Sequence, residues 1–276
     1  MYLIFDTETT GLPKRWNAPI TDIDNWPRCI QIAWQLHDAL GNCIEHQDYL
    51  IRPDGFNIPY DAEKIHGIST ELASEQGLAL AEVLELFNIA LSKTTFVVGQ
   101  NLGFDLNIMG CEFHRLQVAS PLSELPVLDT CTEKTAKLCK IPGGRGGRFK
   151  LPTLTELHQH LFGKAFSEAH NATADVEATS RIFLELLRKD NLHPEVFDNQ
   201  QAQTLEIREI STPFKLIGLS HQHLKEASAV LKKDKVDIKK STLHSGISSD
   251  LANAPFVHLH NHSQFSVVQA TSRIDQ

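Results

Sequence analysis

Two acidic residues, Asp6 and Glu8, directly follow an apolar run at residues 2–5. Side chains two positions apart on a strand point to the same face, so the two carboxylates would lie together at the strand end. Two like charges that close are unfavourable unless a cation neutralises them, and hard divalent ions prefer oxygen ligands. The pair therefore indicates a divalent-metal site, although a polar strand end leading into the turn Thr9-Thr10-Gly11 would give the same pattern.

Two more carboxylates and a histidine lie farther along the chain, near expected strand exits and helix starts. Asp105 follows the segment Gly99-Gln-Asn-Leu-Gly-Phe104, Asp175 starts a helix, and His170 precedes Asp175 by five residues. Taken singly, each acid would suit a helix-capping role, and the histidine would suit a surface loop. Taken together with the first pair, they form the set of groups that two-metal phosphodiester hydrolysis requires.

The elements that must position these side chains follow from hydrophobic periodicity and turn signals. Hairpin strands come first and strands alternating with helices follow, which predicts an α/β fold with a mixed sheet flanked by helices. Strands are expected at residues 2–5, 29–36, 43–51, 95–98 and 127–128, and helices at 80–91, 103–116, 131–140, 153–161 and 176–187. Beyond residue 190, residues 221–233 give an amphipathic helical pattern.

Three segments of the chain resemble the three motifs of the DEDDh 3′→5′ exonucleases. They are Phe5-Asp-Thr-Glu-Thr-Thr-Gly-Leu12, Gln100-Asn-Leu-Gly-Phe-Asp105 and His170-Asn-Ala-Thr-Ala-Asp175, in the order and with the spacings usual for that family. The resemblance covers residues 1–188 and, within the family, is greatest to the proofreading epsilon subunits of bacterial DNA polymerase III. It implies a ribonuclease-H-like fold with a five-stranded mixed sheet.

The resemblance also implies a role for each motif residue. Two Mg²⁺ or Mn²⁺ ions would be shared by Asp6, Glu8, Asp105 and Asp175, and His170 would be the general base that takes a proton from the attacking water. Substrate-binding roles follow for Thr9, Leu12, His66, Asn101 and Phe104. Leu12 would wedge against a base, although Leu12 and Ile68 would equally suit the hydrophobic core.

Composition and charge restrict the class of protein further. The 276 residues include 26 Lys and Arg against 34 Asp and Glu, and residues 1–190 hold 17 basic and 25 acidic groups (17 − 25 = −8), so the net charge of −8 lies wholly in the part with the nuclease motifs. No apolar run approaches the about 18 residues of a membrane helix. The start does not resemble a signal peptide, and five cysteines without a C-x-x-C pair favour reduced thiols and a cytoplasmic location.

A glycine-rich basic segment at residues 141–148 is not assigned by the resemblance and is expected to lack regular structure. Arg145, Arg148 and Lys150 would suit the backbone phosphates of a single strand. A solvated insertion is the alternative.

The C-terminal part carries a second resemblance. Phe256-Val-His-Leu-His-Asn-His-Ser-Gln-Phe-Ser266 is similar to the opening of the PHP domain of the polymerase III alpha subunit, where His260 and His262 would be metal ligands. The remaining ligands are missing, so we expect these histidines to be inert. We therefore expect an exonuclease domain at 1–188, a linker with a small helical element at 189–255 and a truncated PHP-like start at 256–276. An exonuclease joined in cis to a polymerase explains this order, and an unfused exonuclease is the alternative.

The sequence thus predicts an Mg²⁺- or Mn²⁺-dependent 3′→5′ exonuclease that releases nucleoside monophosphates from DNA 3′ ends. The expected role is replication proofreading, with the DNA polymerase III alpha subunit as partner. Three alternatives remain open: the same chemistry on RNA ends, a non-catalytic module that binds 3′ ends or docks a polymerase, and PHP-type phosphoesterase activity at His260 and His262 that would survive loss of Asp6.

Overall fold

The computed structural model describes residues 1–166, 169–189 and 223–245, and its centre is a five-stranded mixed sheet in the order β3-β2-β1-β4-β5. β1 (Tyr2–Thr9), β2 (Cys29–His37) and β3 (Cys43–Leu50) are antiparallel neighbours, and β4 (Phe96–Gly99) and β5 (Val127–Asp129) run parallel to β1. The predicted α/β fold with a mixed sheet is confirmed.

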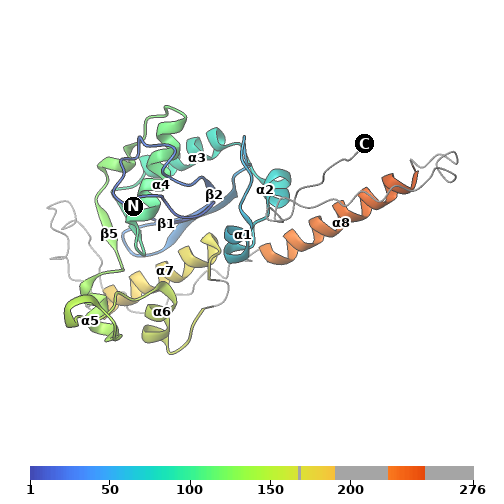
Figure 1. The fold of residues 1–276 in the computed structure, drawn as a ribbon. Coiled ribbons are helices and arrows are strands. Elements are labelled where there is room, and N and C mark those ends of the chain that lie inside the picture. Colours follow the sequence, from blue (N-terminus) through green and yellow to red (C-terminus); the bar gives the residue numbers. More distant parts are fainter. Residues whose placement is uncertain (167–168, 190–222, 246–276) are drawn as a thin grey trace. The chain divides into compact units, whose positions relative to one another are not determined.

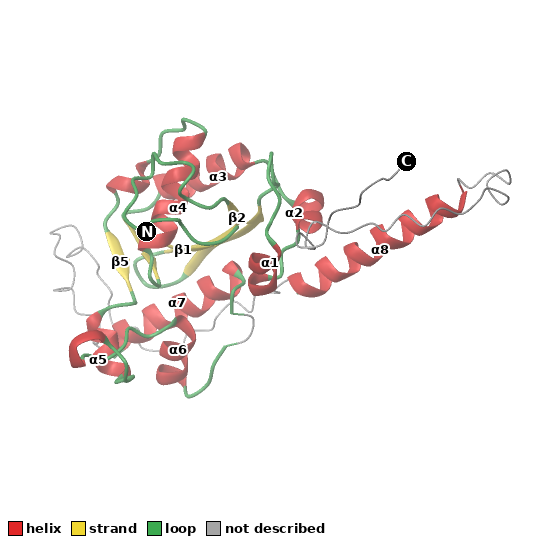
Figure 2. Ribbon diagram, in the orientation of Figure 1, coloured by secondary structure: helices red, strands yellow, loops and turns green. Residues whose placement is uncertain are grey.

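Helices cover both faces of this sheet (Figure 1). On one face lie α3 (Leu80–Ser92) and α4 (Gly103–Arg115), and on the other lie α7 (Ala172–Arg188), α6 (Leu154–Phe162) and α5 (Glu133–Cys139). Two short helices, α1 (Tyr60–His66) and α2 (Thr70–Gln76), follow β3. Figure 2 shows the strands between these helices and the long loops that join them.

The apolar side chains of β1 point alternately to the two faces of the sheet and contribute to both layers of the core. Leu3 and Phe5 pack with α3 and α4, whereas Tyr2 and Ile4 pack with α6 and α7. Because side chains alternate along a strand, a shift of the β1 register by one residue would exchange the two sets. The apolar residues of β1 therefore also fix the side of the sheet to which its carboxylates point.

The structure extends several predicted elements. β1 continues through Thr9 instead of ending before Asp6, so both acidic residues lie on the strand itself. The predicted helix at 221–233 starts at Leu224 and runs through the lysine-rich stretch to Ser245 as α8. The glycine-rich segment, expected to be irregular, contains the short 3-10 turn Arg145–Gly147. The seven-residue helices α1 and α2 were not predicted.

Two compact units divide the chain, Met1–Lys232 and Lys233–Gln276. Within the first unit, Leu224 is buried, and the Ser228 hydroxyl donates to the Gly67 carbonyl at 2.6 Å and accepts from the Ser69 N–H at 3.1 Å. The start of α8 therefore packs on α1 and α2. Most of the predicted linker and the motif with His260 and His262 lie outside the described residues. No helix in the described part is long and apolar enough to cross a membrane.

Candidate active site

Four carboxylates meet at the edge of the sheet where the parallel strands end. Asp6 and Glu8 lie on β1, Asp105 lies in the first turn of α4 and Asp175 in the first turn of α7. Parallel strands bring their C-terminal ends to one edge, so the chain that leaves β4 delivers Asp105 beside the end of β1. Glu8 and Asp175 are each 9% exposed and Asp105 is 5% exposed. The site is therefore a nearly buried acidic cluster.

Burial and mutual repulsion change how readily these carboxyls ionise. The pKa of Asp6 is well above its ordinary value because of burial and then the charges of Asp105, Asp175 and Glu8, and the pKa of Glu8 is raised in the same way. Burial raises the pKa of Asp105 to about 7, although Thr7 opposes this through hydrogen bonds from its hydroxyl at 2.6 Å and its N–H at 3.0 Å. Burial likewise raises the pKa of Asp175 to about 7. A cluster that resists ionisation requires a cation to hold it charged at neutral pH.

Glu8, His170 and Asp175 have the geometry of a metal site. Each offers one ligand atom, and these three atoms lie within 4.8 Å of one another. Oδ2 of Asp175 accepts the backbone N–H of His170 at 3.1 Å, whereas Oδ1 is buried and has no hydrogen-bond partner among the described residues. A buried carboxylate oxygen with no partner is unfavourable unless a cation binds it. Carboxylate oxygens and an imidazole are ligands that divalent metal ions take in proteins, so the residues fit a divalent cation.

The start of α7, which carries Asp175, is tied to the sheet. Gln31 of β2 donates through Nε2 to Asn171 Oδ1 at 3.3 Å and accepts the Ala172 N–H through Oε1 at 3.2 Å. Asn171 is the N-cap of α7, and the residue before it, His170, has a left-handed φ of 69°. Non-glycine residues seldom adopt that conformation, and those that do are found disproportionately at functional sites. Gln31 thus helps to hold both Asp175 and His170 in place.

Asp129 positions the motif that contains Asp105. Its carboxylate, at the end of β5, accepts three backbone N–H groups, from Asn101 at 2.7 Å, Leu102 at 2.8 Å and Cys131 at 2.7 Å. Asn101 has a left-handed φ of 61°, which turns the chain sharply between β4 and α4. Asp129 and Thr7 were not predicted as site residues, because Thr7 contacts Asp105 and Asp129 contacts Asn101 and Leu102, all of them distant in the sequence.

His66, one of the predicted substrate-binding residues, lies beside His170. Burial, followed by the nearby His170 and Lys225, lowers the pKa of His66 to about 4, whereas the backbone of Thr9 acts in the opposite direction. His66, His170 and residues 223–226 line a pocket of 250 Å³. Thr9, also predicted, is therefore part of the same neighbourhood.

The other predicted substrate-binding residues differ in exposure. Leu12 is 73% exposed, so it is not a core residue, whereas Ile68 is fully buried in the core. Asn101 is exposed beside the end of β4, and Phe104 is half-buried with its ring 5.8 Å from that of Trp16. The sequence left a core role open for both Leu12 and Ile68, and the structure places Ile68 in the core and Leu12 on the surface.

Comparison with known proteins identifies the family. A family model described as "Exonuclease" (RNase_T) matches residues 3–183. The chain belongs to this exonuclease family. The family-level prediction made from the three motifs is therefore confirmed.

The relatives of this chain are longer proteins, and the chain matches only a part of each. It is 31% identical over 190 residues to the 3′-5′ exonuclease DinG of Bacillus subtilis and 28% identical over 188 residues to the PolC-type DNA polymerase III of Streptococcus pneumoniae. Each match covers 68% of this chain but only 18% and 11% of those relatives. Escherichia coli Exonuclease I, solved in complex with a dT13 oligonucleotide, has the same fold, with a TM-score of 0.56, 24% identity, and 71% of this chain and 42% of that chain covered.

Proposed function

We propose that this exonuclease hydrolyses DNA strands from the 3′ end and releases nucleoside monophosphates, with divalent ions held by Asp6, Glu8, Asp105 and Asp175. The observation that carries the proposal is that an imidazole nitrogen of His170 and one carboxylate oxygen each of Glu8 and Asp175 lie within 4.8 Å of one another, which brings the proposed base to the acidic cluster. Among the residues that the structure describes, the buried Oδ1 of Asp175 has no hydrogen-bond partner, which supports a cation at this place.

The mechanism assigns separate tasks to the ions and to the chain. Mg²⁺ or Mn²⁺ bound by the carboxylates would polarise the phosphate and offset the charge that develops on the leaving 3′ oxygen. His170, whose side chain is exposed next to the cluster, accepts the proton of the attacking water. The backbone N–H of His170 donates to Asp175, which holds the segment that carries the base beside the acidic cluster.

Substrate recognition follows from the groups around the cluster. His66, with a pKa of about 4, is neutral at pH 7 and lies beside the base, where it suits an uncharged sugar or base edge of the terminal nucleotide. Leu12 exposes most of its apolar side chain, as a residue that wedges against a base would. Asn101 and Phe104 follow β4 directly and would contact the same nucleotide.

A replication role is part of the proposal. The likeness to a segment of a PolC-type DNA polymerase III supports proofreading in cis or in complex with a polymerase III alpha subunit. Co-elution of the full chain with that subunit on size exclusion would support the partnership, and separate elution at micromolar concentrations would contradict it.

The catalytic assignment is tested with 3′-labelled oligonucleotides. In Mg²⁺, Asp6→Ala and His170→Ala should each lower the rate of label release by about 100-fold or more, whereas Asp54→Asn, a change at an exposed loop residue, should not. Unchanged release by His170→Ala would contradict the base assignment, and activity that survives Asp6→Ala would favour a phosphoesterase site elsewhere. Comparing the rates of hydrolysis of DNA and RNA strands of the same base sequence determines whether the substrate is DNA or RNA.

A further inference from the structure

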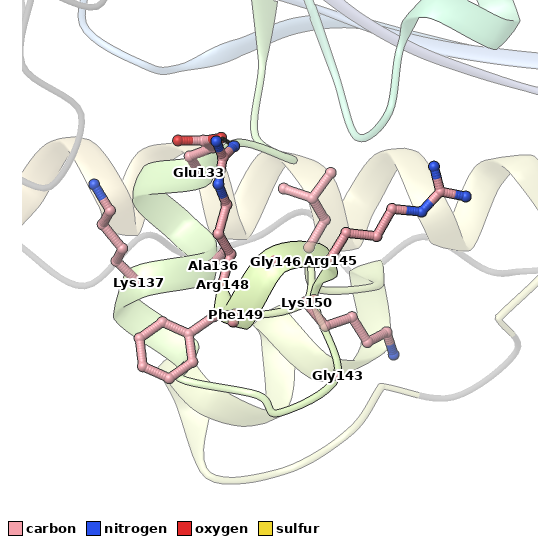
Figure 3. Close-up of a pocket in the computed structure, with 12 residues that line it drawn as sticks. Glu133, Ala136, Lys137, Gly143, Arg145, Gly146, Arg148, Phe149 and Lys150 are labelled. Carbon is pink, nitrogen blue, oxygen red and sulfur yellow. Dashed lines mark hydrogen bonds and ion pairs between the residues drawn. The ribbon is translucent and has the colours of Figure 1, made fainter.

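The segment between α5 and α6 surrounds a pocket of 890 Å³ that is positively charged (Figure 3). Its charged lining residues are Lys137, Arg145, Arg148, Lys150 and the single carboxylate Glu133. Four cations and one anion give a local charge of 4 − 1 = +3, in a chain whose net charge is −8. Phe149 and Leu151 complete the lining with exposed apolar side chains.

Part of this positive charge is available to a ligand. Two of the cations are paired with carboxylates, Arg148 with Glu133 at 2.6 Å and Lys150 with Glu156 at 2.7 Å. Within the part of the chain that the structure describes, Arg145 and Lys137 have no ion pair. Figure 3 shows the Arg145 side chain extending away from the paired Arg148 and Glu133. These two cations can therefore meet an anion without first breaking a salt bridge.

Glycines give the pocket its shape. Gly143, Gly146 and Gly147 have φ values of 108°, 66° and 75°, a region that other residues seldom adopt. At Gly144, a Cβ atom would lie 2.4 Å from the carbonyl oxygen of Phe149, so the loop folds back tightly on itself at this point. The segment is thus built as a turn whose backbone leaves room for a bound group.

The loop is fixed at the edge of the sheet that holds the carboxylates. The Lys150 N–H closes the base of the loop on the Ile141 carbonyl at 2.8 Å. The Pro152 carbonyl then accepts the Gln100 side-chain amide at 2.9 Å. Gln100 directly follows β4 and lies five residues before Asp105. A strand whose 3′ end reaches the acidic cluster would therefore have this pocket near its path.

We propose that this pocket binds the single strand on the 5′ side of the terminal nucleotide, with separate backbone phosphates on Arg145 and Lys137 and a base stacked on Phe149. The inference rests on the proposed function, because it places the pocket along the substrate strand. Proteins that bind single strands combine cations with exposed aromatic rings, and stacking tolerates any base. Phe149 is 43% exposed and lines the pocket, so part of its side chain is accessible to a ligand.

The test measures binding and hydrolysis separately. Fluorescence anisotropy in EDTA, which prevents cleavage, compares oligothymidylates of about 4 and about 16 nucleotides. Arg145→Ala and Phe149→Ala are compared with the controls Lys93→Ala and Ile44→Ala, which remove an exposed cation, paired with Glu45 at 3.1 Å, and an exposed apolar side chain at other elements. Hydrolysis of the p-nitrophenyl ester of thymidine 5′-monophosphate in Mg²⁺ reports on the acidic cluster alone.

Both loop variants should bind the long strand about fivefold or more weakly, bind the short strand within about twofold of the parent, and hydrolyse the ester at the parental rate. Arg145→Ala should also reduce the slope of log affinity against log salt by about 0.7. Long-strand affinities equal to those of the matched controls would overturn the inference, as would equally effective competition by polyglutamate of the same charge. Absence of ester and oligonucleotide hydrolysis by the parent would instead overturn the proposed function.

Discussion

Replacing Asp175 with asparagine should stabilise the metal-free protein, and the gain should grow as the pH rises. The folded protein holds the Asp175 carboxyl at a pKa of about 7, against 3.8 for an ordinary aspartate. The pKa of this carboxyl is higher in the folded state than in the unfolded state. Its contribution to the free energy of unfolding is therefore complete only below about pH 4, and it is lost as the pH rises through about 7. The cause is burial of a charge beside other carboxylates.

The magnitude follows from the two pKa values. Between about pH 6 and about pH 8, the free energy of unfolding should fall by about 1.4 kcal/mol through this carboxyl, which is about 3–6 °C in the midpoint of thermal unfolding. Asparagine carries no charge, so Asp175→Asn should lack this loss. Asparagine also removes the repulsion that Asp175 exerts on Asp6 and Glu8, so their pKa values move back toward the ordinary range and the gain from Asp175→Asn has the same sign from both sources.

Thermal and urea unfolding in EDTA measure the effect, with Asp54→Asn as a control at an exposed loop position. Saturating Mg²⁺ or Mn²⁺ should reverse the order, because ions that bind the ionised cluster stabilise the parent more than Asp175→Asn. The reasoning would be refuted if the free energy of unfolding changed equally with pH in the parent and in Asp175→Asn between pH 6 and 8. The folded protein would then not raise the pKa of the Asp175 carboxyl.

Three further substitutions test the groups that position the site. Asp129→Asn replaces the carboxylate that accepts three backbone N–H groups, so the free energy of unfolding measured in urea should fall by about 1–3 kcal/mol. An unchanged free energy of unfolding would contradict this role of Asp129. Thr7→Val removes the hydroxyl that binds Asp105 and should raise the Mg²⁺ concentration for half-maximal activity by about tenfold or more, with no rise as the opposing result. Ser228→Ala leaves the Gly67 carbonyl without its donor, so proteolysis within α8 should accelerate while thermal unfolding still shows a folded first unit; parental proteolysis would show that this contact does not hold α8.

The sheet was predictable from local periodicity, whereas the acidic cluster was predictable only from the three motifs taken together, since Asp105 and Asp175 would each suit a helix-capping role. Asp6 and Glu8 follow an apolar run and share one face by the period of a strand, and Asp105 and Asp175 begin helices with clear apolar faces. The seven-residue helices α1 and α2 are too short to show a period.

The groups that support the cluster could not be predicted in the same way. Thr7 meets Asp105 across 98 positions, and Gln31 meets Asn171 across 140. Ser228 packs on α2 across 159 positions, from a stretch whose lysines suggest a solvated helix. Such contacts depend on tertiary packing, and a single sequence carries no local pattern for them.

The direction and product of cleavage test the central proposal most directly. A 5′-labelled single strand of DNA, incubated with the parent and Mg²⁺ and resolved on a sequencing gel, should give a ladder of labelled strands that shorten from the 3′ end, together with nucleoside monophosphates. EDTA should stop the reaction. Release of the 5′ label in the first products, cutting of a circular single strand, or intact DNA in both Mg²⁺ and Mn²⁺ would contradict a metal-dependent 3′→5′ exonuclease.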